Sequence, residues 1–145
     1  MVKKFEPKSL TFCIEGKPIP LARPRLGNKR LWDDQKNLKI IVGITMRNAI
    51  PDDFTGEWYF TGPLHLKVIF HLMPSKTNRK KQTKLEGRPY TQCPDLSNLI
   101  KFIEDTAQGV LYRNDSYIVS IVALKQYSSS QKTIVTFSEL PPEGS

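Results

Sequence analysis

The sequence predicts an α+β fold (mixed α/β): a single domain over residues 1–145, with a mixed sheet of about four strands and two main helices. Residues 10–15 and 64–72 alternate between apolar and polar side chains, which is the pattern of half-buried strands. Residues 32–50 and 95–109 carry apolar side chains three and four positions apart, as amphipathic helices do. Two further apolar segments, 117–126 and 132–137, predict strands after the second helix.

Composition is that of a globular protein without a membrane span. Apolar residues make up 39% of the chain and charged residues 25%, both ordinary values. The longest apolar runs fall well short of the ~20 residues that cross a bilayer, so no membrane partner is expected. Cys13 and Cys93 are far apart and form neither a disulfide framework nor a metal-binding pair, which favours reduced thiols in a cytosolic protein.

The charge is basic and unevenly distributed. Lysine and arginine number 22 against 14 acidic residues, giving a net charge of +8. Residues 1–30 hold eight bases and two acids, and residues 76–88 hold six bases and one acid. Two basic segments on a mildly acidic body suggest a polyanionic partner such as DNA, although a solvated positive face explains the composition equally well.

The first strand leads into a basic loop. Glycine and prolines in the segment GKPIPLARPRLGNKR prevent regular structure there. Guanidinium groups on an extended loop suit bidentate phosphate contacts, so the loop is a candidate DNA-binding segment. Its candidate residues are Arg23, Arg25, Lys29 and Arg30.

The first helix is expected from Trp32 to Ile50, with Asp33 or Asp34 as its start signal and Pro51 as its end. Its apolar side chains form a stripe that we expect to pack on the core. The stripe comprises Leu38, Ile41, Val42, Thr45, Met46 and Ala49.

In the predicted strand 64–72 every second residue is apolar and is expected to face the core. A basic loop over residues 73–92 follows this strand. This loop is expected to be mobile without a ligand and to clamp a nucleic-acid backbone. Tyr90 near its end could stack on an exposed base. The candidate phosphate-binding residues are Lys76, Arg79, Lys80, Lys81, Lys84 and Arg88.

The segment 94–115 holds most of the candidate chemistry. Asp95 lies where an N-cap belongs, and Gly109 marks the end of the helix. The predicted buried face comprises Leu96, Leu99, Ile100, Ile103 and Ala107, and the opposite face Asn98, Lys101 and Asp105. Carboxylates at both ends, a central lysine and Asp115 beyond the helix could bind a divalent metal.

The last two strands are expected to form a hairpin through the residues Ser-Ser-Ser-Gln. The first of them carries a nearly continuous apolar run, which predicts a central strand. Residues 140–145 are expected to be a loose tail.

The spacing within 94–115 also forms a motif. It is carried by Pro94, Asp95, Ser97, Asn98, Leu99, Lys101, Asp105, Gly109, Val110, Asn114 and Asp115. The motif, the preceding segments GKPIPLARPR and GPLHLKVIFHLMP, the basic loop and Lys125 resemble the RusA family of Holliday junction resolvases. Most of the chain is covered by this resemblance.

Two motif positions differ from the family pattern. Ser97 stands where the family has the second aspartate of Asp-x-Asp, and Asn114 where it has the first of the closing Asp-Asp pair. The resemblance implies Asp95 and Asp115 as magnesium ligands, with Ser97 as a weak or water-mediated one. Asp105 and Glu104 are candidate substitutes, and by helical geometry only Asp105 shares the face of Lys101. Lys101 corresponds to the catalytic lysine, or forms an i,i+4 ion pair with Asp105.

The resemblance implies a homodimeric crossover junction endodeoxyribonuclease of bacterial or prophage origin, acting in the cytoplasm in DNA recombination and repair. Mg²⁺ is the expected cofactor, with Mn²⁺ as a substitute, and a four-way DNA junction is the expected partner. Because Ser97 and Asn114 reduce the local negative charge, a junction-binding protein with lost or weak nuclease activity is the alternative. A general single-strand or RNA-binding module that uses Tyr90 and the lysine-rich loop is the third reading.

Overall fold

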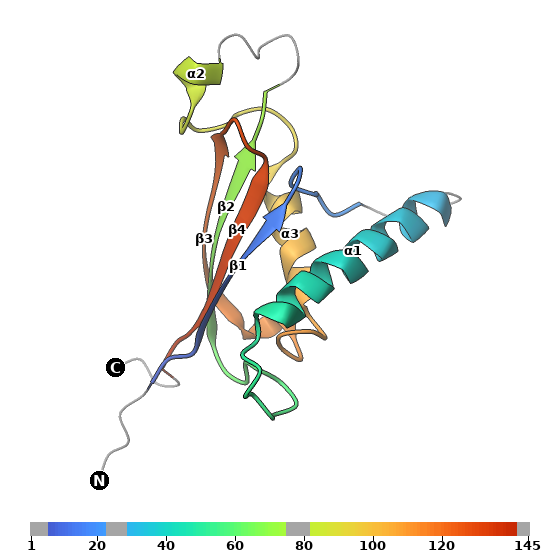
Figure 1. Ribbon diagram of the computed structural model, residues 1–145, viewed down its shortest axis with the longest axis vertical. Coiled ribbons are helices and arrows are strands. Elements are labelled where there is room, and N and C mark those ends of the chain that lie inside the picture. Colours follow the sequence, from blue (N-terminus) through green and yellow to red (C-terminus); the bar gives the residue numbers. More distant parts are fainter. Residues whose placement is uncertain (1–5, 23–28, 75–81, 142–145) are drawn as a thin grey trace.

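A computed structural model describes residues 6–22, 29–74 and 82–141 of the chain. Strand β1 (Ser9–Glu15) is followed by helix α1 (Lys29–Ala49), strand β2 (Leu64–Leu72) and the short helix α2 (Gln82–Leu85). Helix α3 (Leu96–Ala107), the 3₁₀ turn η2 (Asp115–Tyr117) and strands β3 (Ile118–Tyr127) and β4 (Lys132–Glu139) complete the chain (Figure 1).

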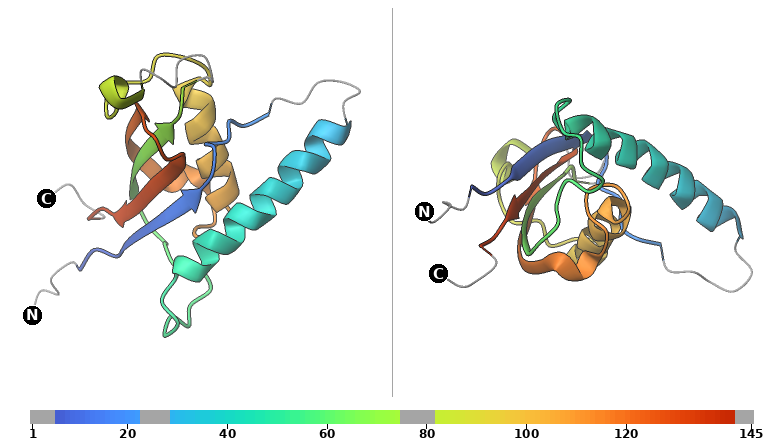
Figure 2. Two further views of the ribbon diagram at one scale, coloured as in Figure 1. Left: turned by 45° about the horizontal axis from the view of Figure 1, so that its top comes forward. Right: turned by 90° about the horizontal axis from the view of Figure 1, so that it is seen from below.

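The four strands form one mixed sheet in the order β1-β4-β2-β3. Strand β4 pairs antiparallel with both β1 and β2, whereas β2 pairs parallel with β3. Helices α1 and α3 both lie on one face of this sheet (Figure 2). The predicted α+β fold, with a mixed four-stranded sheet and two main helices, is therefore confirmed.

The core lies between the sheet and the two helices. Alternate residues of β2, from Leu64 to Leu72, are buried there as the sequence predicts. Helix α3 adds Leu99, Phe102 and Ile103 from the other side. Burial of such side chains stabilises the fold by roughly 1.5–3 kcal/mol each relative to full exposure.

The predicted hairpin of the last two strands is wrong. Strand β2 lies between β3 and β4 and pairs with both. The four residues that join β3 to β4 cross the end of β2, where the Ser128 amide donates to the Leu72 carbonyl at 2.9 Å. A short connection predicts a hairpin only when nothing separates the strands, and sequence proximity does not reveal a strand inserted from earlier in the chain.

Strand β3 is an edge strand, so its predicted central position is also wrong. Its apolar run is exposed to solvent, with exposed fractions of 63% for Val119 and 56% for Val122. Ile121 and Leu124 are exposed as well. A continuous apolar run indicates that both faces of a strand are covered. Here the described residues of one chain do not cover them.

Helix α1 begins at Lys29, three residues before the predicted start, and it presents a different face to the core. Val42 and Met46 are buried as expected, but Leu38 is 37% exposed and Ile41 is 61% exposed. The N-terminal half of α1 extends beyond the sheet (Figure 2), so the core covers only part of the apolar surface of this helix.

The second half of the segment after β2 contains a short helix and hydrogen bonds to β3. Residues 75–81 lie outside the described part, but α2 follows them directly. Hydrogen bonds then tie the chain to β3: the Gly87 amide donates to the Tyr127 carbonyl, and the Tyr90 amide to the Lys125 carbonyl, both at 2.9 Å. The predicted tail also starts later, because the Leu140 amide donates to the Pro63 carbonyl.

Candidate active site on helix α3

Asp95 occupies the N-cap position of α3, as predicted, but its carboxylate does not cap the helix. The residue has an extended backbone, and its side chain makes no capping hydrogen bond. Its carbonyl oxygen accepts the first helical hydrogen bond from the Leu99 amide at 3.2 Å. Asp95 is exposed, so its carboxylate is available to a metal or a ligand.

The chain that leads into α3 is held by Lys125 of β3. The Lys125 ammonium donates to the carbonyl oxygens of Gln92 at 2.8 Å and Pro94 at 2.7 Å. It also lies 5.6 Å from the centre of the Tyr90 ring. Lys125 therefore positions the start of the motif next to Asp95.

Tyr90 is not the base-stacking platform that the sequence suggested. Its side chain is only 8% exposed, and its ring packs against Tyr127 with 4.7 Å between ring centres. Tyr90 lies next to the basic residues in the sequence, but its ring is packed in the core beneath them.

The buried face of α3 agrees with its periodicity. Leu99, Ile103 and Ala107 are buried, and Leu96 and Ile100 are half-buried. The helix ends at Ala107, and Gly109 follows with a φ of 87°. That left-handed backbone favours glycine and ends the helix, and the chain then continues to Asp115.

Asp115 is fixed at the C-terminal end of α3. Its amide donates to the Gln108 side-chain oxygen at 3.0 Å. Asn114 caps η2, because its side-chain oxygen accepts from the Ser116 amide at 2.9 Å. The asparagine that replaces a family aspartate therefore has a local structural role, and the exposed carboxylate of Asp115 faces solvent beside it.

Glu104 belongs to the electrostatic surroundings of Asp115. The pKa of Glu104 is raised, mainly because the side chain is partly buried and also because the charge of Asp115 is close. The charge of Lys101 offsets part of this rise in pKa. The Tyr112 hydroxyl donates to the Glu104 carbonyl at 2.8 Å, and burial raises the pKa of that hydroxyl above its usual range.

Asp105 points elsewhere. Its carboxylate pairs with the Lys39 ammonium of α1 at 2.6 Å, so its ion pair is with the neighbouring helix and not with Lys101. The i,i+4 ion pair between Lys101 and Asp105 that the spacing allowed is therefore replaced by a pair with Lys39. A wheel of one helix contains no information about a lysine on α1, which only the tertiary packing brings to Asp105.

The structure holds Asp95 and Asp115 apart within one chain. Helix α3 has 12 residues and is therefore about 18 Å long (Figure 1). Asp95 is its N-cap, and Asp115 contacts Gln108 just after its last residue. Exposed Lys101 and Ser97 lie between them. Residues 6–22, 29–74 and 82–141 contain no group of three or more His, Cys, Asp or Glu side chains placed to hold a metal.

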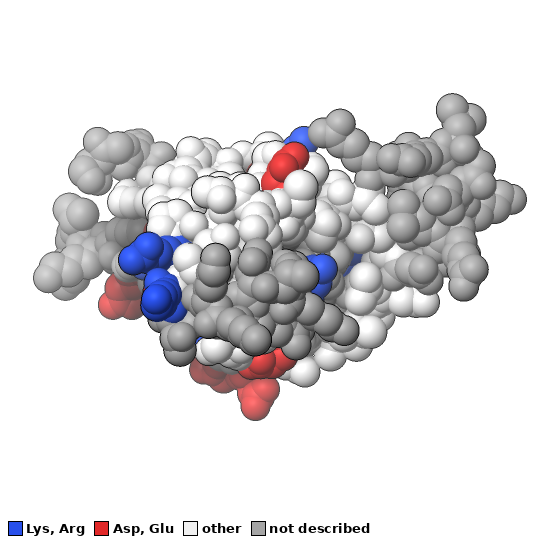
Figure 3. Space-filling model, turned by 90° about the horizontal axis from the view of Figure 1, so that it is seen from above, with Lys and Arg blue, Asp and Glu red and all other residues white. Residues whose placement is uncertain are grey.

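Part of the predicted basic surface can be located. Lys84 and Arg88 are exposed near α2, and Lys29 and Arg30 begin α1 instead of lying in the loop. Figure 3 shows basic surface at several places on the end of the molecule that carries α2. The other candidates, Arg23, Arg25, Lys76, Arg79, Lys80 and Lys81, lie outside the described residues.

The segment before Arg23 runs beside the motif. The Leu21 amide donates to the Asn98 carbonyl of α3 at 2.9 Å. The Gln35 side chain of α1 holds the same segment through the Ala22 amide and the Pro20 carbonyl, both at 3.2 Å. Residues 21 and 22, which lead into the first basic segment, are therefore held next to α3.

The sequence profile of the family "Endodeoxyribonuclease RusA" matches residues 15–138. The chain belongs to the RusA family. The match spans both main helices, strands β2 and β3, nearly all of β4 and the whole motif, so the chain has the fold of a family of endodeoxyribonucleases. A curated relative, "Uncharacterized protein YqaN" of Bacillus subtilis (strain 168), is 28% identical over 143 residues, covering 90% of this chain and 96% of the relative.

RusA family nucleases generally depend on a divalent metal. Asp95 and Asp115 are exposed carboxylates, and magnesium needs only one or two of these because it retains several waters. Within the described ranges, no helix is both long enough and apolar enough to span a membrane.

Proposed function

We propose that the protein is a magnesium-dependent endodeoxyribonuclease that resolves four-way DNA junctions by paired symmetric nicks. The observation that carries the proposal is the exposure of Lys101 on α3, of Asp95 at its N-cap and of Asp115 beyond its C-terminal end, in a chain of the RusA family. These are the groups that metal-assisted phosphodiester hydrolysis needs: carboxylates to hold the ion and a cation to meet the phosphate.

Each motif residue has a chemical role in this proposal. Asp95 and Asp115 hold the ion, and exposed Ser97 adds a hydroxyl ligand, directly or through water. Bound Mg²⁺, or Mn²⁺ in its place, polarises the scissile phosphate and lowers the pKa of the attacking water. The Lys101 ammonium stabilises the charge that develops on the phosphate. Lys125 acts indirectly, because it fixes the backbone that precedes Asp95.

A homodimer gives these residues a common site. Asp95 precedes α3 and Asp115 follows its C-terminal end, so a helix about 18 Å long separates them within one chain. In a two-fold dimer with antiparallel α3 helices, Asp95 of one copy would lie beside Asp115 of the other. Such a dimer has two equivalent sites, which matches the two symmetric nicks of junction resolution.

Strand β3 is the surface that we assign to this dimer. It runs antiparallel to α3, since its residue Lys125 lies near Asp95 and its first residue follows the η2 turn of Asp115. Its outer edge pairs with residues 87–90 at Lys125–Tyr127, and the exposed residues that precede this paired part are apolar: Val119, Ile121, Val122 and Leu124. An uncharged apolar strip complements itself across a two-fold axis, as an isologous interface requires.

DNA binding is assigned to the basic segments around residues 16–30 and 76–88, whose contacts would be to phosphates. Such contacts position the junction without reading sequence and weaken as salt rises. Cytoplasmic location, a bacterial or prophage origin, a role in recombination and repair, and a single domain over residues 1–145 complete the proposal.

The direct test is a nicking assay on a labelled synthetic four-way junction with Mg²⁺ or Mn²⁺, with linear duplex of the same sequence as control. We expect paired nicks at symmetric positions of the junction, and loss of cleavage in EDTA and in Asp115→Asn. Gel shifts in EDTA measure binding separately. Cleavage of duplex and junction at equal rates contradicts the assignment of the substrate.

A junction-binding protein without useful nuclease activity is the second candidate, and the observation that favours it is Ser97. This exposed hydroxyl stands where the family carries an aspartate, so the site has one carboxylate fewer. Tight, salt-sensitive junction binding in EDTA with no cleavage in either metal would establish this alternative. The single-strand or RNA-binding reading loses its main support, because Tyr90 is buried.

A further inference from the structure

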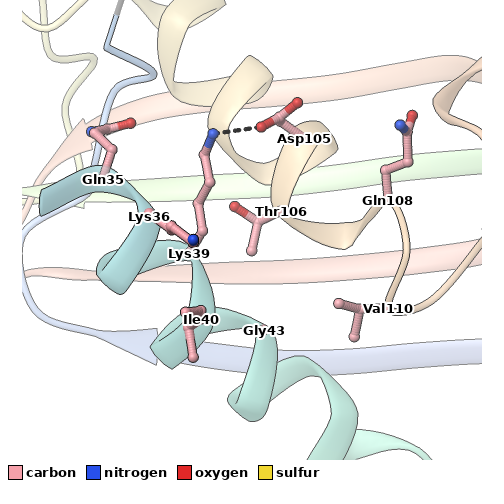
Figure 4. A pocket seen from close by; sticks show the side chains of 9 residues that line it. All are labelled: Gln35, Lys36, Lys39, Ile40, Gly43, Asp105, Thr106, Gln108 and Val110. Atoms are coloured by element: carbon pink, nitrogen blue, oxygen red, sulfur yellow. Dashed lines mark ion pairs between the residues drawn. The ribbon is translucent and has the colours of Figure 1, made fainter. Parts of the chain in front are cut away.

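A cavity of about 530 Å³ lies between α1 and α3, and Asp95, Lys101 and Asp115 are not among the residues that line it. This volume is within the range of small-molecule sites in proteins, roughly 300–1,000 Å³. Figure 4 shows its walls: Ile40, Gly43 and Val110 on the apolar side, with Thr106 and the Lys39–Asp105 ion pair across from them.

Thr106 places an unpaired hydroxyl at this cavity. The residue is 4% exposed, and its Oγ1 has no hydrogen-bond partner among the described residues. Threonine in a helix commonly returns this hydroxyl to a carbonyl one turn earlier. A buried hydroxyl without a partner destabilises a protein, and an occupant of the cavity with a polar edge would remove that penalty.

Gly43 leaves the same cavity open. It lies inside α1, where glycine is less favourable than alanine, and it is not among the residues with positive φ. A Cβ placed there would meet only Val110 Cγ2, at 3.6 Å, which is an ordinary contact. Neither the backbone nor close packing therefore requires glycine, and the missing side chain gives the cavity its depth.

The polar groups around the cavity indicate the chemistry of an occupant. Lys39 and Asp105 form an ion pair and offset each other's charge, so the net positive charge of the rim comes from Lys36. Gln108 lines the cavity and accepts a hydrogen bond from the Asp115 amide at 3.0 Å. An occupant would therefore lie one side chain away from a proposed metal ligand.

From these observations we infer that the cavity binds a nucleotide. Ile40, Gly43 and Val110 form the surface for the base, and the Thr106 hydroxyl and the Gln108 amide can hydrogen-bond its edge. Lys36 and Lys39 meet its phosphate. The inference rests on the proposed function: the nucleotide is one that leaves the stack at the branch point of the DNA next to the cut. Free nucleotides share this chemistry and are separated by the test.

The experiment uses junctions with 2-aminopurine beside the branch point, bound in EDTA so that no cleavage occurs. Unstacking raises the fluorescence of this base, so binding of the wild-type protein should raise it. Thr106→Val removes the hydroxyl without changing shape and should lower the inserted population about three- to tenfold, the value of one hydrogen bond. Gly43→Leu fills the cavity and should abolish the rise.

A matched control and a stability measurement separate binding from folding. Gly62→Ala adds a methyl group that meets nothing within 4 Å, away from the cavity, and should leave the fluorescence unchanged. Thr106→Val and Gly43→Leu should melt at or above the wild-type temperature, because each removes an unfavourable feature of the fold. A purely structural role for these residues predicts lower melting temperatures instead.

The source of the nucleotide is tested with the four deoxynucleoside 5′-monophosphates, titrated against wild type and both variants. A fluorescence rise that both variants reduce supports the DNA-borne nucleotide. Binding of a free monophosphate that both variants weaken, with the junction signal unaffected, overturns the DNA source. No rise and no monophosphate binding overturns the cavity's role. If wild type fails to shift junctions at all, the proposed function is wrong, and the monophosphate titration still tests the cavity.

Discussion

Ser97 and Asn114 occupy motif positions where the family carries carboxylates, and the structure separates their consequences. Asn114 caps η2 through its side-chain oxygen, so its amide contributes to the local fold next to Asp115. Ser97 is exposed on the surface of α3, two residues after Asp95. Ser97 is therefore the substitution that we expect to lower the metal affinity of the proposed site.

Ser97→Asp should strengthen the site, because it restores a negative oxygen ligand beside Asp95. We expect the Mg²⁺ concentration for half-maximal nicking to fall about tenfold, the usual size of a change in the ligand surroundings. Ser97→Ala is the matched control and should raise that concentration. An unchanged Mg²⁺ requirement in both variants would show that residue 97 does not contribute to the site.

Asp105 should have only a structural effect, because its carboxylate pairs with Lys39. Asp105→Asn is expected to lower the free energy of unfolding by no more than about 1 kcal/mol, since the pair is partly exposed. High salt should reduce this difference, as urea titrations at two ionic strengths would show. If Asp105→Asn changes the Mg²⁺ concentration needed for nicking, this assignment is contradicted and Asp105 is a metal ligand.

At this scale the motif positions could be predicted from sequence, and the contacts of each residue could not. Asp95, Lys101 and Asp115 are exposed along α3, as their spacing suggested. The partner of Asp105 comes from α1, and the link between Glu104 and Asp115 depends on how the chain turns at Gly109. Both are tertiary features that no helical wheel contains.

Strand β3 shows how an element can be recognised while its place is missed. Its apolar run identified a strand, and the same run suggested a central position. The strand lies at the edge instead, with apolar side chains exposed where a second copy would cover them. An interface strand and a central strand have the same composition, because both are buried in the state that functions.

Val122→Glu should dissociate the proposed dimer, because it places like charges across a two-fold apolar interface. We expect the mass in solution, measured by light scattering, to fall from that of a dimer to that of a monomer. Ile44→Glu on α1 is the matched control, since Ile44 is 54% exposed and Val122 is 56% exposed. A dimer that survives Val122→Glu but not Ile44→Glu would move the interface to α1.

His71 on β2 should make stability depend on pH. Burial lowers its pKa below the usual 6.5, the Lys132 charge lowers it further, and Glu86 offsets part of this. The unfolded chain therefore binds the proton more tightly, so this contribution to stability is present above about pH 6.5 and is lost as the pH falls through both pKa values. Melting curves of His71→Gln should show a smaller loss between pH 7 and pH 5 than wild type, and an equal loss would contradict the assignment.

In the whole molecule, helix α3 both contributes to the core and separates Asp95 from Asp115. The helix is about 18 Å long, with Asp95 before its first residue and Asp115 beyond its last, and the edge strand β3 leaves apolar side chains exposed. A two-fold axis at this edge would convert two incomplete sets of ligands into two complete sites. The family resemblance predicts Asp95 and Asp115 as ligands and a homodimer, but only the structure shows that a whole helix separates these two aspartates.

A shared site can be tested by mixing two inactive variants. Dimers that combine one Asp95→Asn copy with one Asp115→Asn copy, purified by different tags, would contain one site with both substitutions and one intact site. Each variant alone should be inactive on a four-way junction with Mg²⁺, whereas the mixed dimer should nick one strand without the paired second cut. Inactive mixed dimers that still form and bind junctions would contradict the shared site, as would full paired cleavage by either variant alone.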